Sequence, residues 1–279
     1  MTPEKFAELA SQNFNRIPVT RKVLADFETP LSVYLKLAYG ANSYLFESVQ
    51  GGEKWGRYSL IGLQTSTVLR VYGQQLEIIK DGKPMVNRHT DDPMAEVERF
   101  RQLFSMPDLP DLPRFTGGLV GYFGYDTVRY VEPKLAKSQP KDELGTPDIL
   151  LMASDEVAIF DNLSGTLMLV VHVDAGESEG LAKANARLDE LQQKLAEPAP
   201  KIPESEQQLQ ELSEDDFKSS FGQDKFLKSV DKIKDYIMAG DAMQVVPSQR
   251  LSAPFKAAPL NLYRALRRLN PSPYMYFLD

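Results

Sequence analysis

A carboxylate and a hydroxyl stand side by side at Glu47 and Ser48, and these two side-chain types suit a small ligand with an amino group. A carboxylate pairs with an ammonium group, while a hydroxyl both donates and accepts hydrogen bonds. The pair follows the apolar residues 44–46, and the chain's single tryptophan, Trp55, comes soon after. Neighbouring residues of a regular strand point to opposite faces unless a bulge redirects one of them. Composition alone favours a solvent-exposed strand, with a binding pair as the alternative.

A second candidate lies near the end of the chain, where two prolines precede an aromatic, a methionine and another aromatic residue. Pro271 and Pro273 favour an extended backbone whose carbonyl groups remain available to accept hydrogen bonds. Met275, between Tyr274 and Tyr276, is ordinarily a core side chain. The alternative is that Met275 lines a pocket for a flat aromatic ligand.

A glycine-rich stretch at 117–124 resembles a phosphate-binding loop only at first sight. Its spacing matches neither G-x-G-x-x-G nor a P-loop, and apolar and aromatic residues separate its glycines. Glycine within a strand marks a close approach of two backbones. The pattern therefore favours a closely packed strand over a ligand loop.

Groups that serve in acid–base catalysis or zinc binding are scarce in this chain. It has two histidines and no cysteine, which excludes disulfides, thiolate nucleophiles and cysteine-bound metals. His172 lies in an apolar strand-like run and is more often a structural histidine there. His89 lies in a polar stretch that indicates a solvated loop. We assign no catalytic and no metal-binding residue from the sequence.

The elements that would position these residues are short strands interspersed with amphipathic helices. Helices are expected over 3–14, 30–39, 93–104, 177–195, 224–239 and 259–269. Strands are expected over 43–49, 65–72, 76–80, 117–125, 148–152, 156–160, 166–173, 242–251 and 273–278. The fold class that follows is α+β, with antiparallel sheets and amphipathic helices packed outside them.

The 279 residues are enough for one large domain or two ordinary ones. Residues 197–216 hold three prolines and seven acidic residues against one lysine, which is typical of a solvated linker. We therefore expect a first domain at 1–196 and the start of a second at 217–279. A chain that stops on an apolar strand leaves an edge without a partner, so we expect the second domain to be truncated.

Overall charge and hydropathy limit the binding partners. Lys and Arg number 32 against 39 Asp and Glu, and the net charge of −7 argues against binding to nucleic acid or anionic membranes. No stretch approaches the roughly 18 apolar residues of a membrane-spanning helix, and the N-terminus lacks an apolar signal core. We expect a soluble cytoplasmic protein.

Taken together and in order, several segments resemble the family of anthranilate synthase large subunits (component I). The resemblance covers nearly the whole chain, and its segments are 45–48 (LFES), 56–59 (GRYS), 117–125, 239–250 and 270–275 (NPSPYM). Phe46 stands where a leucine is common in the family. The PYM sequence at 273–275 is more similar to this family than to its relatives, the aminodeoxychorismate and isochorismate synthases.

The resemblance implies a two-domain chorismate-utilising fold, whose second domain is incomplete here. It implies a lyase of tryptophan biosynthesis that converts chorismate and ammonia to anthranilate and pyruvate. In the family Mg²⁺ binds the substrate carboxylate, and a glutamine amidotransferase (component II) supplies ammonia in an assembly of two large and two small subunits. The metal ligands and catalytic residues of the family lie beyond Asp279, so this chain by itself is expected to be inactive.

The resemblance also implies a site for feedback inhibition by L-tryptophan. It maps to Glu47, Ser48, Pro273, Tyr274 and Met275, with Tyr58 and Ser59 as secondary candidates. Two alternatives stay open. The full-length protein could be a chorismate enzyme of the aminodeoxychorismate synthase type, or this chain alone could be a tryptophan-binding module without catalysis.

Overall fold

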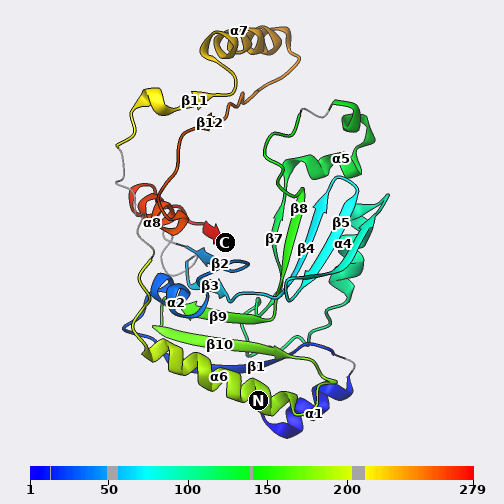
Figure 1. Cartoon of the computed structure of the whole chain (residues 1–279), viewed down its shortest axis with the longest axis vertical. Coiled ribbons are helices and arrows are strands. Elements are labelled where there is room, and N and C mark those ends of the chain that lie inside the picture. Colours follow the sequence, from blue (N-terminus) through cyan, green and yellow to red (C-terminus); the bar gives the residue numbers. More distant parts are fainter. Residues whose placement is uncertain (13, 49–55, 139–140, 203–210) are drawn as a thin grey trace. The chain divides into compact units, whose positions relative to one another are not determined.

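The computed structural model describes residues 1–12, 14–48, 56–138, 141–202 and 211–279. Trp55 and residues 203–210 of the expected linker lie outside the described residues. The chain forms two compact units, each described by itself below (Figure 1). The first unit comprises Met1–Lys201 and Leu266–Asp279, and the second comprises Ile202–Ala265.

Six strands of the first unit form an antiparallel sheet in the order β1-β10-β9-β3-β2-β13. Their bounds are β1 (Ile17–Leu24), β10 (Thr166–Val173), β9 (Glu156–Asp161), β3 (Tyr58–Gly62), β2 (Tyr44–Glu47) and β13 (Met275–Leu278). Strand β13 pairs with β2 so that Met275 lies opposite Glu47. This pairing is the reason why the last residues of the chain, expected in a second domain, lie in the first compact unit. The expected domain limits themselves stay a prediction.

A second antiparallel sheet of the first unit has the order β6-β5-β4-β8-β7. Its strands are β6 (Lys83–His89), β5 (Gln75–Lys80), β4 (Thr67–Tyr72), β8 (Ile149–Ser154) and β7 (Gly118–Phe123). They run across the direction of β9 and β10 (Figure 1). Asp155 alone separates β8 from β9, so the chain passes from one sheet into the other within a single residue.

Apolar side chains fill the space between the two sheets, and helices pack against the other face of each sheet. Tyr44 of the first sheet packs with Val68, Val120 and Met152 of the second. Helix α4 (Pro93–Gln102) buries Val97 and Phe100 against the other face of the second sheet. Helices α2 (Pro30–Leu37) and α6 (Gly180–Ala196) contact the first sheet, and α1 (Pro3–Ser11) contacts β1. Short helical turns complete the unit at η1 (Tyr125–Thr127), α5 (Val128–Val131) and η2 (Pro133–Ser138).

These helices begin where the sequence places capping residues. Thr2 and Thr29 each accept a hydrogen bond from a backbone N–H of the first turn, and a proline follows each of them. Ser32 returns a bond to the backbone of Thr29 and completes a capping box. Helices α1, α2, α4 and α8 (Pro259–Leu269) start at the predicted residues, whereas α6 starts three residues after the expected 177 and α7 (Gln223–Ala239) one residue before the expected 224. The α+β class with antiparallel sheets is confirmed.

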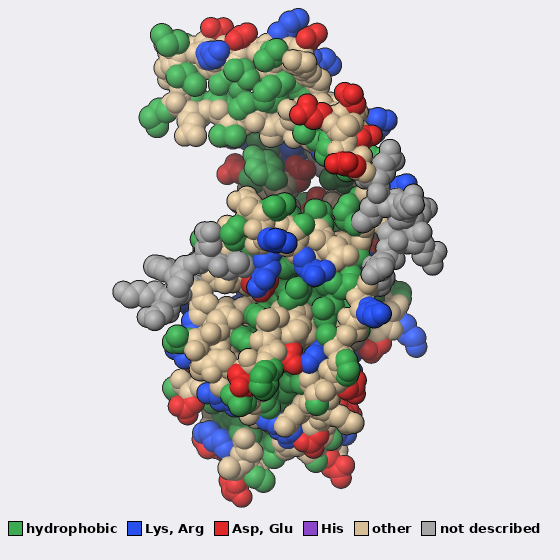
Figure 2. Space-filling model, turned by 90° about the vertical axis from the view of Figure 1, so that its left-hand side faces the viewer, with side chains coloured by type: hydrophobic (Ala, Val, Ile, Leu, Met, Phe, Trp, Pro, Cys, Tyr) green, Lys and Arg blue, Asp and Glu red, His purple; other side chains and the backbone are tan. Residues whose placement is uncertain are grey.

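The second unit contains one long helix and little else that is regular. Its elements are η3 (Glu214–Asp216), β11 (Lys218–Ser219), α7 (Gln223–Ala239) and β12 (Leu251–Ser252), while α8 (Pro259–Leu269) begins in it and ends in the first unit. Gly240 ends α7 in the left-handed conformation, as its position predicts. No described residue of α7 is buried, and its hydrophobic side chains lie open at the top of Figure 2.

Two expectations about regular structure were wrong. The strand expected over 242–251 is irregular up to the two-residue β12; Pro247, in this stretch, cannot donate the hydrogen bond that a paired strand needs. His89 was expected in a loop but ends β6, where its ring contacts Gln74 and its side chain is exposed. Pairing decided both outcomes: His89 pairs with Gln75 of β5, whereas Leu251 alone of the expected strand pairs, with Ser219 of β11.

Candidate ligand-binding site

A cavity of about 480 Å³ in the first unit lies beside the ends of β2 and β13. It is lined by Phe46, Glu47, Ser48, Tyr58, Leu60, Gly121, Tyr122, Tyr274, Met275, Tyr276 and Leu278. Most of these side chains are aromatic or aliphatic, and Glu47 is the one that is charged at neutral pH among the described lining residues. An apolar cavity with few convergent polar groups is the usual form of a small-molecule site.

Glu47 and Ser48 both line this cavity, although strand alternation predicted opposite faces. Strand β2 ends at Glu47, so the alternation no longer constrains Ser48. Glu47 is 5% exposed, which overturns the interpretation of the pair as a solvated strand surface. Ser48 is half-buried beside it.

The carboxylate of Glu47 is held by Arg267 in the last turn of α8. The Arg267 Nε donates to Glu47 Oε2 at 3.0 Å, and its terminal Nη2 donates to Oε1 at 3.1 Å. The Glu47 side chain is 2% exposed and that of Arg267 is 35% exposed. A buried carboxylate needs such a partner, because removing a charge from water is costly unless it is paired.

Strand β13, paired with β2 in the same sheet, also contributes lining residues to the cavity. Met275 is half-buried opposite Glu47, and Tyr274 and Tyr276 are largely exposed at the opening. Pro273 is exposed and is not among the lining residues. The structure therefore brings together Glu47, Ser48, Tyr274 and Met275 of the predicted set, and it leaves the Pro273 ring outside.

The two secondary candidates, Tyr58 and Ser59, are consecutive residues of β3, and only one of them lines the cavity. Tyr58 lines the cavity, and Arg57 stacks on its ring at 4.9 Å from the centroid. Ser59 points away from the cavity, is 1% exposed and accepts a hydrogen bond from Asn162 Nδ2 at 3.1 Å. Alternation along a strand accounts for this result.

Arg267, Gly121 and Tyr122 are among the contributors to the site that sequence reasoning missed. Arg267 stood in a helix with two other arginines nearby, and nothing in that pattern distinguished it. Gly121 and Tyr122 lie on β7, in the glycine-rich stretch that was correctly predicted to be a closely packed strand. Burial raises the pKa of Tyr122, whose hydroxyl donates to Pro147 O at 2.9 Å. Gly121 and Tyr122 reach the cavity because the second sheet packs on the first.

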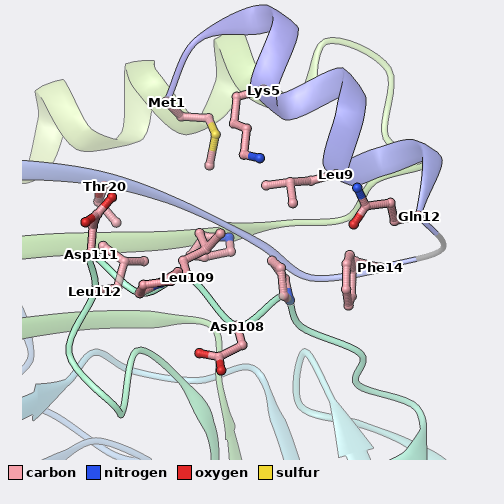
Figure 3. A pocket seen from close by; sticks show the side chains of 13 residues that line it. Met1, Lys5, Leu9, Gln12, Phe14, Thr20, Asp108, Leu109, Asp111 and Leu112 are labelled. Atoms are coloured by element: carbon pink, nitrogen blue, oxygen red, sulfur yellow. The ribbon is translucent and has the colours of Figure 1, made fainter.

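A cavity of about 500 Å³ lies elsewhere in the first unit, between α1, β1 and residues 107–112. Figure 3 shows Leu9, Leu109 and Leu112 toward its interior and Lys5 above them. Lys5 is already paired with Glu8 at 3.0 Å. None of the predicted site residues lies here, so we base the functional argument on the cavity at Glu47.

Two kinds of feature are absent from the described residues. In this part of the chain, no group of three or more histidine, aspartate or glutamate side chains is placed to hold a metal ion. No helix among the described residues is long and apolar enough to cross a membrane.

The fold and the cavity can now be compared with known proteins. A family model described as "chorismate binding enzyme" matches residues 42–279. The chain therefore belongs to the family of chorismate binding enzymes.

Within that family the chain is similar to proteins named anthranilate synthase component 1. It is 52% identical to the one from Pseudomonas putida and 53% identical to the one from Pseudomonas aeruginosa, each over 279 residues. All of this chain is covered in both comparisons, but it spans 57% of the length of each relative. Among solved structures, it resembles anthranilate synthase component I from Streptococcus pneumoniae, with a TM-score of 0.60 and 27% identity over 91% of this chain and 54% of that one.

Proposed function

We propose that this chain forms part of an anthranilate synthase large subunit. The supporting observation is the similarity over its whole length to relatives of that name. The proposed reaction adds ammonia at C2 of the chorismate ring, releases the C4 hydroxyl and then eliminates pyruvate to give anthranilate. We assign no step of this reaction to a residue described here.

The proposal includes the rest of the assembly implied by such an enzyme. A glutamine amidotransferase subunit would supply the ammonia, and the name "component 1" of the relatives supports the presence of a second component. Mg²⁺ would bind the substrate carboxylate through ligands outside this chain. We further propose a cytoplasmic assembly of two large and two small subunits.

The cavity at Glu47 is the proposed feedback site for L-tryptophan. Glu47 would accept hydrogen bonds from the ligand ammonium, and Ser48 with the backbone around Pro273 would contact its remaining polar groups. Met275 and the tyrosines at the cavity would contact the indole ring. If tryptophan opposes chorismate binding, chorismate must oppose tryptophan binding by the same factor.

The first experiment is calorimetric titration of tryptophan into the full-length protein, beside a fluorescence assay for anthranilate with chorismate, Mg²⁺ and ammonia. Ser48→Ala should weaken tryptophan binding roughly tenfold, because one hydrogen bond in a buried site is lost. Anthranilate formation should persist in this variant and become less sensitive to tryptophan.

Ser164→Ala is the matched control, because Ser164 is an exposed serine in the turn between β9 and β10 and contacts Thr166. It should bind tryptophan like the wild type. Formation of aminodeoxychorismate in place of anthranilate would refute the proposed activity, and absence of tryptophan binding to the wild type would refute the proposed feedback site.

A further inference from the structure

The ion pair between Glu47 and Arg267 gives the cavity an unusual charge balance. Both carboxylate oxygens of Glu47 accept hydrogen bonds from the guanidinium, at 3.0 and 3.1 Å. Glu47 lines the cavity, whereas Arg267 is not among the lining residues and contacts the carboxylate from outside it. A ligand that reaches Glu47 thus encounters a carboxylate whose charge is already balanced.

This balance affects ligands according to their net charge. A lone carboxylate would attract any ammonium group, but here the positive charge of Arg267 lies within hydrogen-bond distance of the same carboxylate and repels a cationic ligand. An α-amino acid carries its own carboxylate beside its ammonium group, so that its net charge is zero. Its negative group offsets the repulsion between its ammonium group and Arg267.

The other arginine near the cavity does not change this balance. Arg57 stacks on Tyr58, but its guanidinium donates to Asp161, so its charge is also matched. Asp161 is not among the lining residues. Glu47 and Arg267 therefore dominate the local charge among the described groups around this cavity.

We propose that Arg267 determines the ligand specificity of this cavity by favouring a zwitterionic amino acid over a simple amine. The inference rests on the proposed tryptophan site and adds to it a residue that acts on the ligand through Glu47. Arg267 is thus a positioning residue: it holds the carboxylate in place and sets the net charge that the ligand must match. Negative discrimination of this kind is a common source of specificity.

Three indole ligands test the proposal on the full-length wild-type protein: tryptophan with net charge zero, tryptamine with net charge +1 and indole-3-propionate with net charge −1. Tryptophan should bind at least about tenfold more tightly than either analogue, which corresponds to about 1.4 kcal/mol. Tryptamine that binds as tightly as tryptophan would overturn the proposal without the use of any variant.

Arg267→Gln then removes the charge while leaving an amide that can still donate to Glu47. The preference for tryptophan over tryptamine should fall about tenfold or more, whereas Arg267→Lys should keep the preference within about threefold because it retains the charge. A residue that merely braced the strand would lower the affinities for both ligands equally and leave their ratio unchanged.

Arg187→Gln is the matched control. Arg187 makes the same two-bond contact with a strand glutamate, Glu156, at 2.8 and 2.9 Å, and neither residue lines the cavity. This variant has the same net charge as Arg267→Gln and should keep the wild-type ratio. An unchanged ratio in Arg267→Gln with normal tryptophan binding would overturn this inference alone. A wild-type protein that binds no tryptophan would refute the proposed site, and the inference with it. If Arg267→Gln fails to fold, the three-ligand comparison on the wild type decides.

Discussion

Two buried carboxylates of the first sheet, Glu47 and Asp161, are each paired with an arginine, but they lie in different surroundings. Glu47 lines the cavity and pairs there with Arg267. Asp161 ends β9, where it accepts bonds from Arg57 and from the backbone of the following turn. Hydrogen bonding by Arg57, with further donors at Leu163 and Ser164, lowers the pKa of Asp161 to about 2.

This shift predicts a pH-dependent contribution to stability. Because the folded-state pKa of Asp161 lies below its ordinary value of 3.8, ionised Asp161 stabilises the fold above about pH 4, and the contribution is lost as the pH falls toward 2. Asp161→Asn should lower the free energy of unfolding by roughly 2 kcal/mol at pH 6, and by progressively less below pH 4. Urea unfolding across this pH range measures the difference.

Asp91→Asn is the control for that measurement, because the Asp91 side chain is 97% exposed. Asp91→Asn should change the free energy of unfolding by less than about 0.5 kcal/mol throughout this pH range. A constant penalty for Asp161→Asn from pH 6 to pH 3 would contradict the assignment of the effect to ionisation.

At the scale of elements, the packing of strand β7 against its neighbours requires its glycine residues. A Cβ at Gly121 would lie 1.9 Å from the backbone oxygen of Leu150 on β8, and one at Gly117 would lie 2.5 Å from the His172 ring. Glycine therefore permits the close approach of β7 to its neighbours, and Gly121 also forms part of the cavity wall. The glycines have a packing function, as their spacing predicted, and do not form a phosphate loop.

Gly121→Ala should consequently destabilise the protein by roughly 2–3 kcal/mol, because the added methyl group must displace backbone and not a flexible side chain. Gly176→Ala should be nearly neutral, because its Cβ would meet only a side-chain oxygen of Asp174 at 3.5 Å. Thermal unfolding of the two variants provides the comparison. Equal transition temperatures for both would show that β7 can move away from β8 at little cost.

At the scale of the whole molecule, the two compact units differ in how much they bury. Strands β9 and β10 of the first unit are mostly buried, with Ala158, Leu167 and Leu169 fully inaccessible. The α7 helix of the second unit has no buried residue, and Leu227 and Met238 are among its exposed side chains. Tertiary packing supplies most of the stability of a helix in a protein.

Hydrogen exchange on the chain of residues 1–279 should therefore separate the units. Amides of β9 and β10 should exchange only with global unfolding, whereas those of α7 should exchange through local opening at least about a hundredfold faster. The amides in the middle of α6, a helix of equal length that buries Leu188 and Leu191, are the control and should follow the strands. Protection of α7 equal to that of α6 would contradict this expectation.

The sequence by itself determined the starts of most helices, most of the antiparallel strands and the α+β class, because caps, prolines and hydrophobic periodicity act over a few residues. It also pointed to Glu47, Ser48, Tyr274 and Met275, through an ordered set of short segments. It did not predict strands β1, β3 and β6. Only the tertiary structure decided that Tyr58 lines the cavity while Ser59 faces away, that Gly121 and Tyr122 contribute to it, and that Arg267 pairs with Glu47. These outcomes depend on strand register and on contacts between residues far apart in the chain, and neither leaves a periodic signal in the local sequence.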